Sequence, residues 1–330
     1  MTNEPGPDNA GPAPEERQRL RLGSWPTPLE PAPRLATALG LGPDDLWIKR
    51  DDLIGLGGGG NKVRKLEYTL GSAVAAGAGT VITSGAPQSN HARLTAAAAA
   101  RCGLEAVLVL VGDKPADARG NLLLDGILGA ELIWAGHLGH DELAARVEQE
   151  AATRTNDGHP AAVIPFGGSS VLGARGYVRA GEELLHQAPE MSTVVVAVGS
   201  GGTMAGLVHA LGAPRVLGVD TGAVIDGRER VAAMVAGLDG ADAAPNDLRW
   251  DPDQVGAGYG TLVPAVRSAL TLFARSEGIV LDPVYTGRAA AGLVQSVAAG
   301  EIRPGERTVF LHSGGLPGLF GHPEAVSLTR

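Results

Sequence analysis

The feature that most constrains the fold is the regular alternation of short apolar runs with amphipathic segments along the chain. Each apolar run is closed by glycine or by a helix-capping residue, which is typical of strand-to-helix turns. We predict strands at Asp45–Lys49, Thr80–Ser84, Ala106–Val111, Leu132–Ala135, Ala161–Pro165, Thr193–Val198, Arg215–Val219 and Arg307–His312. We predict helices at Lys62–Ala76, Asn90–Cys102, Arg119–Leu128, Asp141–Asn156, Leu172–Gln187, Thr203–Leu211, Pro264–Glu277 and Thr286–Ala299. This order predicts an α/β protein with mainly parallel sheets and ligands at the carboxyl ends of the strands.

Length and composition limit the possible classes of function. A chain of 330 residues can bury a large core and is expected to form two domains. Its net charge of -9 disfavours nucleic-acid binding, and no apolar run is long enough to cross a membrane. The single cysteine, Cys102, excludes an internal disulfide, and the first twenty residues do not resemble a signal peptide. We therefore expect a cytoplasmic enzyme with a frayed N-terminus and no bound metal. The stretch Ala236–Asp253 shows little periodicity and is interpreted as a polar connection.

A glycine-rich turn, GGGGNKVRK at Gly57–Lys65, contains two of the few lysines in the chain. Of 27 lysines and arginines, only four are lysine: Lys49, Lys62, Lys65 and Lys114. A lysine kept in this background suggests chemistry that arginine cannot perform, so Lys62 is our first candidate for a covalent bond to a cofactor. The turn is not a triphosphate-binding loop, because Asn61 precedes the lysine and Val63 replaces the required Ser or Thr. On this motif alone, a flexible loop with a solvated lysine remains the alternative.

Two further turns carry polar groups that could converge with Lys62. SGAPQSNHAR, from Ser84 to Arg93, follows a strand and opens a helix, where Ser89 and Asn90 could cap the helix or bind a carboxylate. His91 could be a base or a hydrogen-bonded structural residue. VAVGSGGTMAG, from Val196 to Gly206, could cradle a phosphate with its amides and hydroxyls. Met204 stands where a dinucleotide fingerprint requires its third glycine, so a single phosphate group is the better interpretation.

Two tyrosines complete the candidate set. Tyr259 lies between glycines in GAGYG, and Tyr285 follows Asp-Pro in LDPVYTG at a predicted helix start. Either ring could instead simply cover apolar surface.

Several segments together carry a family resemblance. They are GGNKVRKLEY, SGAPQSNHARLTAAAA, IPFGGSSVLGARGY, GSGGTMAGL, GYGT, EGIVLDPVYTG and FLHSGG. In this order they resemble the pyridoxal-phosphate enzymes of the D-cysteine desulfhydrase and 1-aminocyclopropane-1-carboxylate deaminase family, from about Pro26 to the C-terminus. The resemblance implies a fold type II, tryptophan synthase β-like architecture with two three-layer α/β domains. We expect a disordered tail at 1–20, a large cofactor-binding domain from 21–64 and 171–330, and a small inserted domain at 65–170.

The resemblance also implies roles for individual residues. Lys62 is similar to the lysine that bonds the cofactor as a Schiff base and acts as base, and Asn90 to the side chain that meets the ring hydroxyl. Tyr259 and Tyr285 would flank the reacting carbon. The phosphate loop would be Gly199, Ser200, Gly201, Gly202 and Thr203, helped by Lys65. The substrate would contact Gln88, Ser89 and His91, with Ser89 and nearby amides holding its carboxylate.

Two positions, Thr286 and His91, bear on the type of reaction. The deaminase branch of the family typically has glutamate after the tyrosine of DPVY, where this chain has Thr286. A hydroxyl from Thr286 or Ser313 at the pyridine nitrogen would give a less protonated ring and a milder electron sink. His91 resembles the desulfhydrase and sulfo-lyase members. We therefore expect β-elimination from a small amino acid by a homodimer. Aminocyclopropane ring opening, L-cysteate sulfo-lysis and a non-catalytic cofactor-binding protein are the alternatives.

Overall fold

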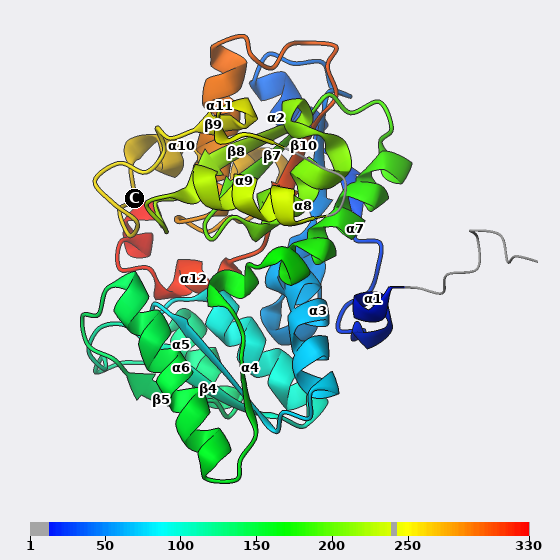
Figure 1. Cartoon of the computed structure of the whole chain (residues 1–330). Coiled ribbons are helices and arrows are strands. Elements are labelled where there is room, and N and C mark those ends of the chain that lie inside the picture. Colours follow the sequence, from blue (N-terminus) through cyan, green and yellow to red (C-terminus); the bar gives the residue numbers. More distant parts are fainter. Residues whose placement is uncertain (1–12, 239–242, 330) are drawn as a thin grey trace, which may run out of the picture.

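The computed structural model describes residues 13–238 and 243–329, which form two mainly parallel sheets, each covered by helices on both faces (Figure 1). The six-stranded sheet has the order β1-β2-β10-β7-β8-β9, and only β1 is antiparallel to its neighbour. The four-stranded sheet has the order β5-β4-β3-β6 and is parallel throughout. The predicted fold class, type II with two three-layer α/β units, is confirmed.

The bounds of the strands follow the apolar runs of the sequence closely. They are β1 Leu29–Pro31, β2 Leu46–Arg50, β3 Thr80–Gly85, β4 Glu105–Leu110, β5 Glu131–Trp134, β6 Ala161–Val163, β7 Thr193–Val198, β8 Val216–Asp220, β9 Arg249–Asp251 and β10 Thr308–His312. The principal helices are α3 Lys62–Ala75, α4 Asn90–Cys102, α5 Gly120–Ile127, α6 His140–Asn156, α7 Val171–Gln187, α8 Gly202–Leu211, α9 Gly227–Gly237, α10 Pro264–Glu277 and α11 Thr286–Ala298. The remaining α-helices are α1 Pro14–Gln18, α2 Pro33–Ala38 and α12 Leu316–Gly321.

Burial explains the three layers of each unit. Side chains of β7 alternate, so that Val195 faces the core beneath α10 and α11 whereas Val194 and Val196 face the core beneath α7 and α8. In the small sheet, Val81 packs with α3 and α4, and Ile82 with α6. Parallel strands buried on both faces must be apolar at nearly every position, which is why the sequence shows continuous apolar runs.

The sequence prediction was wrong about the stretch 236–253. Its described part contains a 3₁₀ turn at Pro245–Asp247 and strand β9, which extends the large sheet beside β8. Residues 239–242 lie outside the described residues. A three-residue strand is too short to show the alternation that identifies longer strands, and the same reason hid β1.

The chain leaves the large sheet after β2, forms the small sheet from β3 to β6, and returns through α7 to β7. Helix α3 packs against both α7 and α4, and α12 packs against α5 (Figure 1). The domain limits 21–64, 65–170 and 171–330 stay predictions. Of the tail expected at 1–20, residues 1–12 lie outside the described residues and Pro14–Gln18 form α1. Within the described part, no helix is both long and apolar enough to span a bilayer.

Candidate active site

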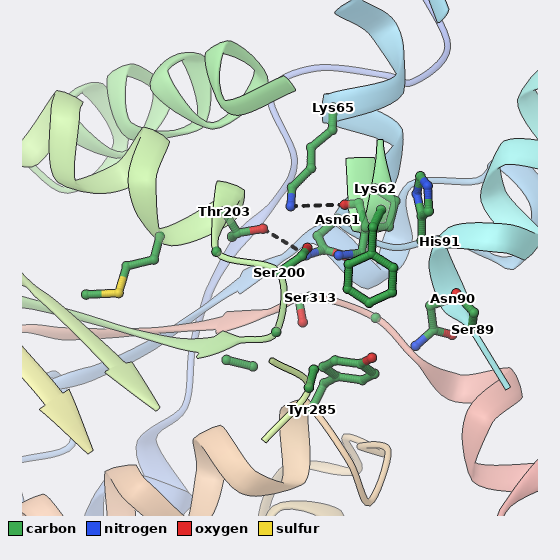
Figure 2. A pocket seen from close by; sticks show the side chains of 18 residues that line it. Asn61, Lys62, Lys65, Ser89, Asn90, His91, Ser200, Thr203, Tyr285 and Ser313 are labelled. Carbon is green, nitrogen blue, oxygen red and sulfur yellow. Dashed lines mark hydrogen bonds between the residues drawn. The ribbon is translucent and has the colours of Figure 1, made fainter. Parts of the chain in front are cut away.

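A cavity lies where the carboxyl ends of β3, β7 and β10 meet the N-terminal ends of α3, α4 and α8 (Figure 2). This is the position at which open parallel sheets bind their ligands. The cavity brings together most of the predicted site residues from distant parts of the chain. Those that line it are Lys62, Lys65, Ser89, Asn90, His91, Gly199, Ser200, Gly201, Thr203, Tyr285 and Ser313.

Lys62 is the first residue of α3, and its turn is tied to two other elements. The backbone N–H of Asn61 donates to the carbonyl of Ser313 at 2.9 Å, and the Asn61 side-chain amide donates to Thr203 Oγ1 at 3.0 Å. The surrounding protein desolvates the amine and lowers the pKa of Lys62 to about 8, although a hydrogen bond with Lys65 opposes that shift. A minor fraction of Lys62 is therefore a neutral nucleophile at neutral pH, and the neutral fraction reaches one half near pH 8.

Lys65 lies one helical turn beyond Lys62 and lies beside the turn 199–203, the predicted phosphate loop. Its Nζ donates to Ser169 Oγ at 2.9 Å, and Ser169 Oγ lies 2.7 Å from Ser200 Oγ. Ser169 Oγ also accepts from the backbone N–H of Gly202 at 3.1 Å. Burial and the charge of Lys62 hold the pKa of Lys65 well below its usual range. An anion placed here would restore the charged form, so the cluster has the chemistry of an anion site.

The phosphate loop also has the space that a phosphate requires. Helix α8 has no side-chain N-cap, and Gly201 before it has φ +92°, a conformation that L side chains rarely adopt. A Cβ at Gly202 would lie 2.7 Å from Ser169 Oγ and 3.2 Å from Lys65 Nζ. A helix N-terminus, a lysine and glycines that keep the approach open together fit a phosphate group.

The start of α4 places two predicted residues, Ser89 and Gln88, differently. Ser89 caps the helix by accepting from the N–H of Ala92 at 3.1 Å. Gln88 does not line the cavity, because its carboxamide donates to the Arg119 carbonyl at 2.9 Å and accepts from the N–H of Asn121 at 2.9 Å. In this structure the Gln88 side chain contacts the start of α5, and its predicted contact with the substrate stays a prediction.

His91 is buried at the cavity wall. Its Nε2 lies 2.9 Å from Thr83 Oγ1, while Nδ1 has no hydrogen-bond partner within the described residues. Burial, together with the charges of Lys62 and Lys65, holds the pKa of His91 well below its usual range. The imidazole is therefore neutral at the pH at which Lys62 is partly neutral.

Tyr259 and Tyr285 form a pair in which only Tyr285 lines the cavity. Their hydroxyl oxygens lie 2.5 Å apart, with the rings edge to face. Burial raises the pKa of both hydroxyls, so both remain protonated at neutral pH. One hydroxyl donates to the other, which orients the pair and leaves one proton available for a further acceptor.

The two candidates for the pyridine nitrogen are not equivalent. Thr286 is fully buried, and its hydroxyl donates to Asp282 Oδ1 at 2.7 Å and accepts from the Asp282 N–H at 2.9 Å. Ser313, after the last residue of β10, lines the cavity. The Thr286 hydroxyl makes both of these hydrogen bonds with Asp282 at the start of α11. Of the two candidates, Ser313 is therefore the hydroxyl that lies in the cavity, where a ligand could bind.

Sequence reasoning missed Asn61, Gly167 and Ser169. A Cβ at Gly167 would clash with Ser200 and lie 3.7 Å from Lys62 Nζ, so the glycine keeps space at the centre of the site. Gly167 and Ser169 belong to IPFGGSS, directly after β6. The end of a predicted parallel strand was the signal that could have identified them.

The fold defines a class, the fold type II α/β enzymes, and the cavity places a glycine-rich turn suited to an anion beside a lysine of lowered pKa. A family model described as "Pyridoxal-phosphate dependent enzyme" matches residues 20–314. The chain belongs to this family, and its cofactor is pyridoxal phosphate.

Several known proteins are similar over nearly the whole chain. A Pyrococcus abyssi protein, provisionally named 1-aminocyclopropane-1-carboxylate deaminase, is 41% identical, with 93% of this chain and 94% of the relative covered. D-cysteine desulfhydrase of Klebsiella pneumoniae (strain 342) is 41% identical, with 92% and 96% covered. A crystal structure described as an ACC deaminase homologue has a TM-score of 0.85 at 38% identity and covers 94% of this chain and 96% of its own. Threonine deaminase isoform 2 of Solanum lycopersicum, at 20% identity and a TM-score of 0.63, shares the fold.

Proposed function

We propose that the protein catalyses β-elimination on a small amino acid, as a D-cysteine desulfhydrase does, giving a 2-oxo acid, ammonia and the leaving group. One observation carries the choice of reaction: among the described residues, no Asp or Glu lines the cavity. When bound, pyridoxal phosphate supplies a conjugated ring that takes up negative charge left at the substrate Cα. A carboxylate at the ring nitrogen would deepen this electron sink, whereas the neutral hydroxyl of Ser313 leaves it milder. A mild sink suits loss of a Cα proton followed by departure of a β substituent.

The residues of the cavity divide the remaining work. Lys65, Ser200, Thr203 and the amides of 199–203 would hold the phosphate, and Lys62 would form the covalent bond to the cofactor. As a neutral amine, Lys62 would take the Cα proton of the substrate, and its lowered pKa makes it suited to this task.

The overall reaction balances with one water. For a cysteine substrate, the Cα–H and Cβ–S bonds break, sulfide leaves, and addition of water releases ammonia and the 2-oxo acid. No external oxidant is needed. We infer that Ser89 and the first amides of α4 hold the substrate carboxylate, and that Tyr285, oriented by Tyr259, contacts the substrate and donates its free proton.

Aminocyclopropane ring opening is the second candidate, favoured by the names of the Pyrococcus relative and the homologous crystal structure. That substrate has no Cα proton, so its ring opens by a route that requires a stronger electron sink. L-cysteate sulfo-lysis would use the same elimination with sulfite as leaving group. A non-catalytic protein is disfavoured by the convergence of Lys62, Tyr285 and the phosphate loop in one cavity.

Product analysis on a substrate panel tests the proposal. D-cysteine, L-cysteine, β-chloro-D-alanine, L-cysteate and aminocyclopropane carboxylate would be incubated with the holoenzyme, and 2-oxo acids identified by mass. We expect pyruvate from a thiol, chloride or sulfonate substrate. Faster formation of 2-oxobutyrate from aminocyclopropane carboxylate would contradict the proposal.

We also propose that the enzyme is a cytoplasmic homodimer. A reducing compartment is compatible with a chain that has a single cysteine. Support for the dimer comes from α5 and α12, which pack together and expose Leu123, Ile127, Leu316 and Phe320. Sedimentation velocity should give a dimer for the wild type, and I127E with F320E should shift the protein toward monomer. A monomeric wild type at micromolar concentration would contradict the assembly.

A further inference from the structure

A single buried arginine on α4 contacts both sides of the active site. Arg93 is fully buried, and its Nη1 donates to the carbonyls of Gly57 at 2.5 Å and Gly59 at 2.9 Å, in the turn that leads to Lys62. Its Nε donates to Asn121 Oδ1 at 3.0 Å and its Nη2 to Asn90 Oδ1 at 3.2 Å. Burial lowers the pKa of Arg93 only to about 10, so it stays charged at neutral pH.

These contacts determine which way two side-chain amides face. A guanidinium can only donate, so Asn121 must present its oxygen to Arg93, and its Nδ2 must point the other way. That Nδ2 donates to Asn90 Oδ1 at 3.0 Å and to the Gln88 carbonyl at 3.0 Å. Asn90 Oδ1 therefore accepts from two donors, Arg93 and Asn121. The amide of Asn90 is left with its NH₂ group for the cavity that Asn90 lines (Figure 2).

We propose that Arg93 and Asn121 are positioning residues that make Asn90 a hydrogen-bond donor to the bound cofactor and hold it in register with the turn before Lys62. The proposal rests on the proposed function, together with the contact to the ring hydroxyl that the family resemblance implies for Asn90. An Asn90 amide turned the other way would present an oxygen that can accept but cannot donate a hydrogen bond to the ligand. The positive charge of Arg93 polarises the Asn90 amide, which strengthens its N–H as a donor.

The guanidinium of Arg93 also binds the glycine turn that precedes Lys62. Gly57 and Gly59 have φ values of +54° and +77°, which leave their carbonyls turned toward Arg93 instead of into a regular element. Because both carbonyls and Asn90 bind one planar group, movement of the turn relative to α4 requires several hydrogen bonds to break together. Arg93 thus couples the position of Lys62 to the position of Asn90.

N121D tests the orientation step with little change of volume. A carboxylate can still accept from Arg93 Nε, but it cannot donate to Asn90 Oδ1 and instead attracts the Asn90 NH₂ away from the cavity. We expect cofactor affinity about ten- to hundredfold weaker, since a hydrogen bond to a charged group contributes roughly 1.5–3 kcal/mol. The absorption spectrum of the Lys62-bound cofactor at constant pH should change in the same direction as in N90A.

A double-mutant cycle separates positioning from general damage. If Asn121 acts through Asn90, N90A/N121D should bind the cofactor as N90A does, with the same spectrum. Equal weakening by N121D in the presence and absence of Asn90, or a wild-type spectrum and affinity in N121D, would overturn the proposal. R93K, which cannot span all four acceptors, provides a second variant and should reproduce the spectral change of N121D.

The control is R101K, at the far end of the same helix, where Arg101 Nη1 donates to the Leu22 carbonyl at 3.3 Å, away from the cavity lining. It should keep the wild-type spectrum and cofactor affinity. Both readouts are independent of the reaction catalysed. An enzyme that opens aminocyclopropane rings would therefore contradict the proposed function and leave this inference standing.

Discussion

At the scale of single residues, the site depends on two amines that the protein keeps short of full charge. Lys62 and Lys65 belong to one helical turn, and burial lowers the pKa of each. The consequences differ because their surroundings differ. Lys65 is hydrogen-bonded to Ser169, which contacts Ser200 in the predicted phosphate loop, whereas Lys62 lies at the first position of α3 on the cavity wall. One amine is suited to anion binding and the other to bond formation.

The lowered pKa of Lys62 predicts the pH dependence of cofactor capture. Below pH 8 the protonated amine predominates and lacks the lone pair that attacks an aldehyde, so the rate of covalent bond formation in apoprotein should rise with pH, with a midpoint near 8, and level off above it. Stopped-flow absorbance at constant ionic strength measures this rate. A midpoint near 10 would contradict the predicted environment of Lys62.

The residue that bonds the cofactor can be identified directly. After borohydride reduction, peptide mapping should place the cofactor on Lys62, and a label on Lys49 or Lys114 would reject the assignment.

The hydroxyls of Ser313 and Thr286 should respond differently to removal. S313A should change the absorption spectrum of the holoenzyme and lower kcat about two- to tenfold, the effect of one neutral hydrogen bond. T286V, which is nearly isosteric, should instead lower the free energy of unfolding by about 1–3 kcal/mol, because buried groups of Asp282 lose their partner. Urea unfolding and spectra of both variants check this. A spectral change in T286V alone would restore the role first predicted for Thr286.

At the scale of elements, the turn between β7 and α8 is the part whose conformation matters most for phosphate binding. Gly201 needs its positive φ for the backbone itself, so a side chain there strains the turn even without ligand. Gly202 is different, because its Cβ position points at Ser169 and Lys65. It is the position at which an added methyl group tests the space for a phosphate.

G202A should weaken pyridoxal phosphate binding about tenfold or more, since overpacking a close approach typically costs about 1–3 kcal/mol. S200A removes one hydroxyl and should weaken it less, and G201V should weaken it more than S200A. Equilibrium titration of apoprotein measures each affinity. The matched control is G126A on α5, where a Cβ meets no atom within 4 Å and affinity should stay unchanged. Equal, negligible effects of all three loop variants would move the phosphate site elsewhere.

At the scale of the whole molecule, a buried ionic cluster joins the end of β2 to α3 and α7. Arg64 contacts Asp51 through two hydrogen bonds, of 2.8 and 2.9 Å, and Glu183 through two more of 2.8 Å. Tyr177 donates to Asp51 at 2.5 Å. Burial alone would favour the protonated carboxyl, but Arg64 keeps the pKa of Asp51 below its usual value. Because Arg64 is two residues from Lys62, this cluster also anchors the first turn of α3.

D51N should therefore destabilise the protein by about 3–5 kcal/mol, the usual cost of breaking a buried ion pair by removing one partner. Urea unfolding of apoprotein, with a constant slope against denaturant, measures the change. D117N removes an exposed carboxylate and should leave the free energy of unfolding within about 0.5 kcal/mol of the wild type. If D51N also left the free energy of unfolding within about 0.5 kcal/mol of the wild type, the cluster would contribute little to stability.

Much of the fold and the site could be predicted because the signals were local. Eight predicted strands correspond to β2 to β8 and β10, since a run buried on both faces must be apolar. The short elements β1, β9 and α12 gave no such pattern. Lys62, Asn90 and the loop at 199–203 were recognisable because a helix start after a strand needs particular glycines and caps.

The sequence by itself determined the fold class, the family and the residues that begin each ligand-facing helix, because these depend on periodicity and on motifs within a few residues. Only the tertiary structure decided that Ser313 lines the cavity, whereas the Thr286 hydroxyl is hydrogen-bonded to Asp282. It also decided that the Gln88 side chain accepts a hydrogen bond from the start of α5. It also placed Arg93 between the glycine turn and Asn90. Those outcomes depend on which donors and acceptors, distant in the chain, are buried together, and each buried polar group must take a partner that the fold alone supplies.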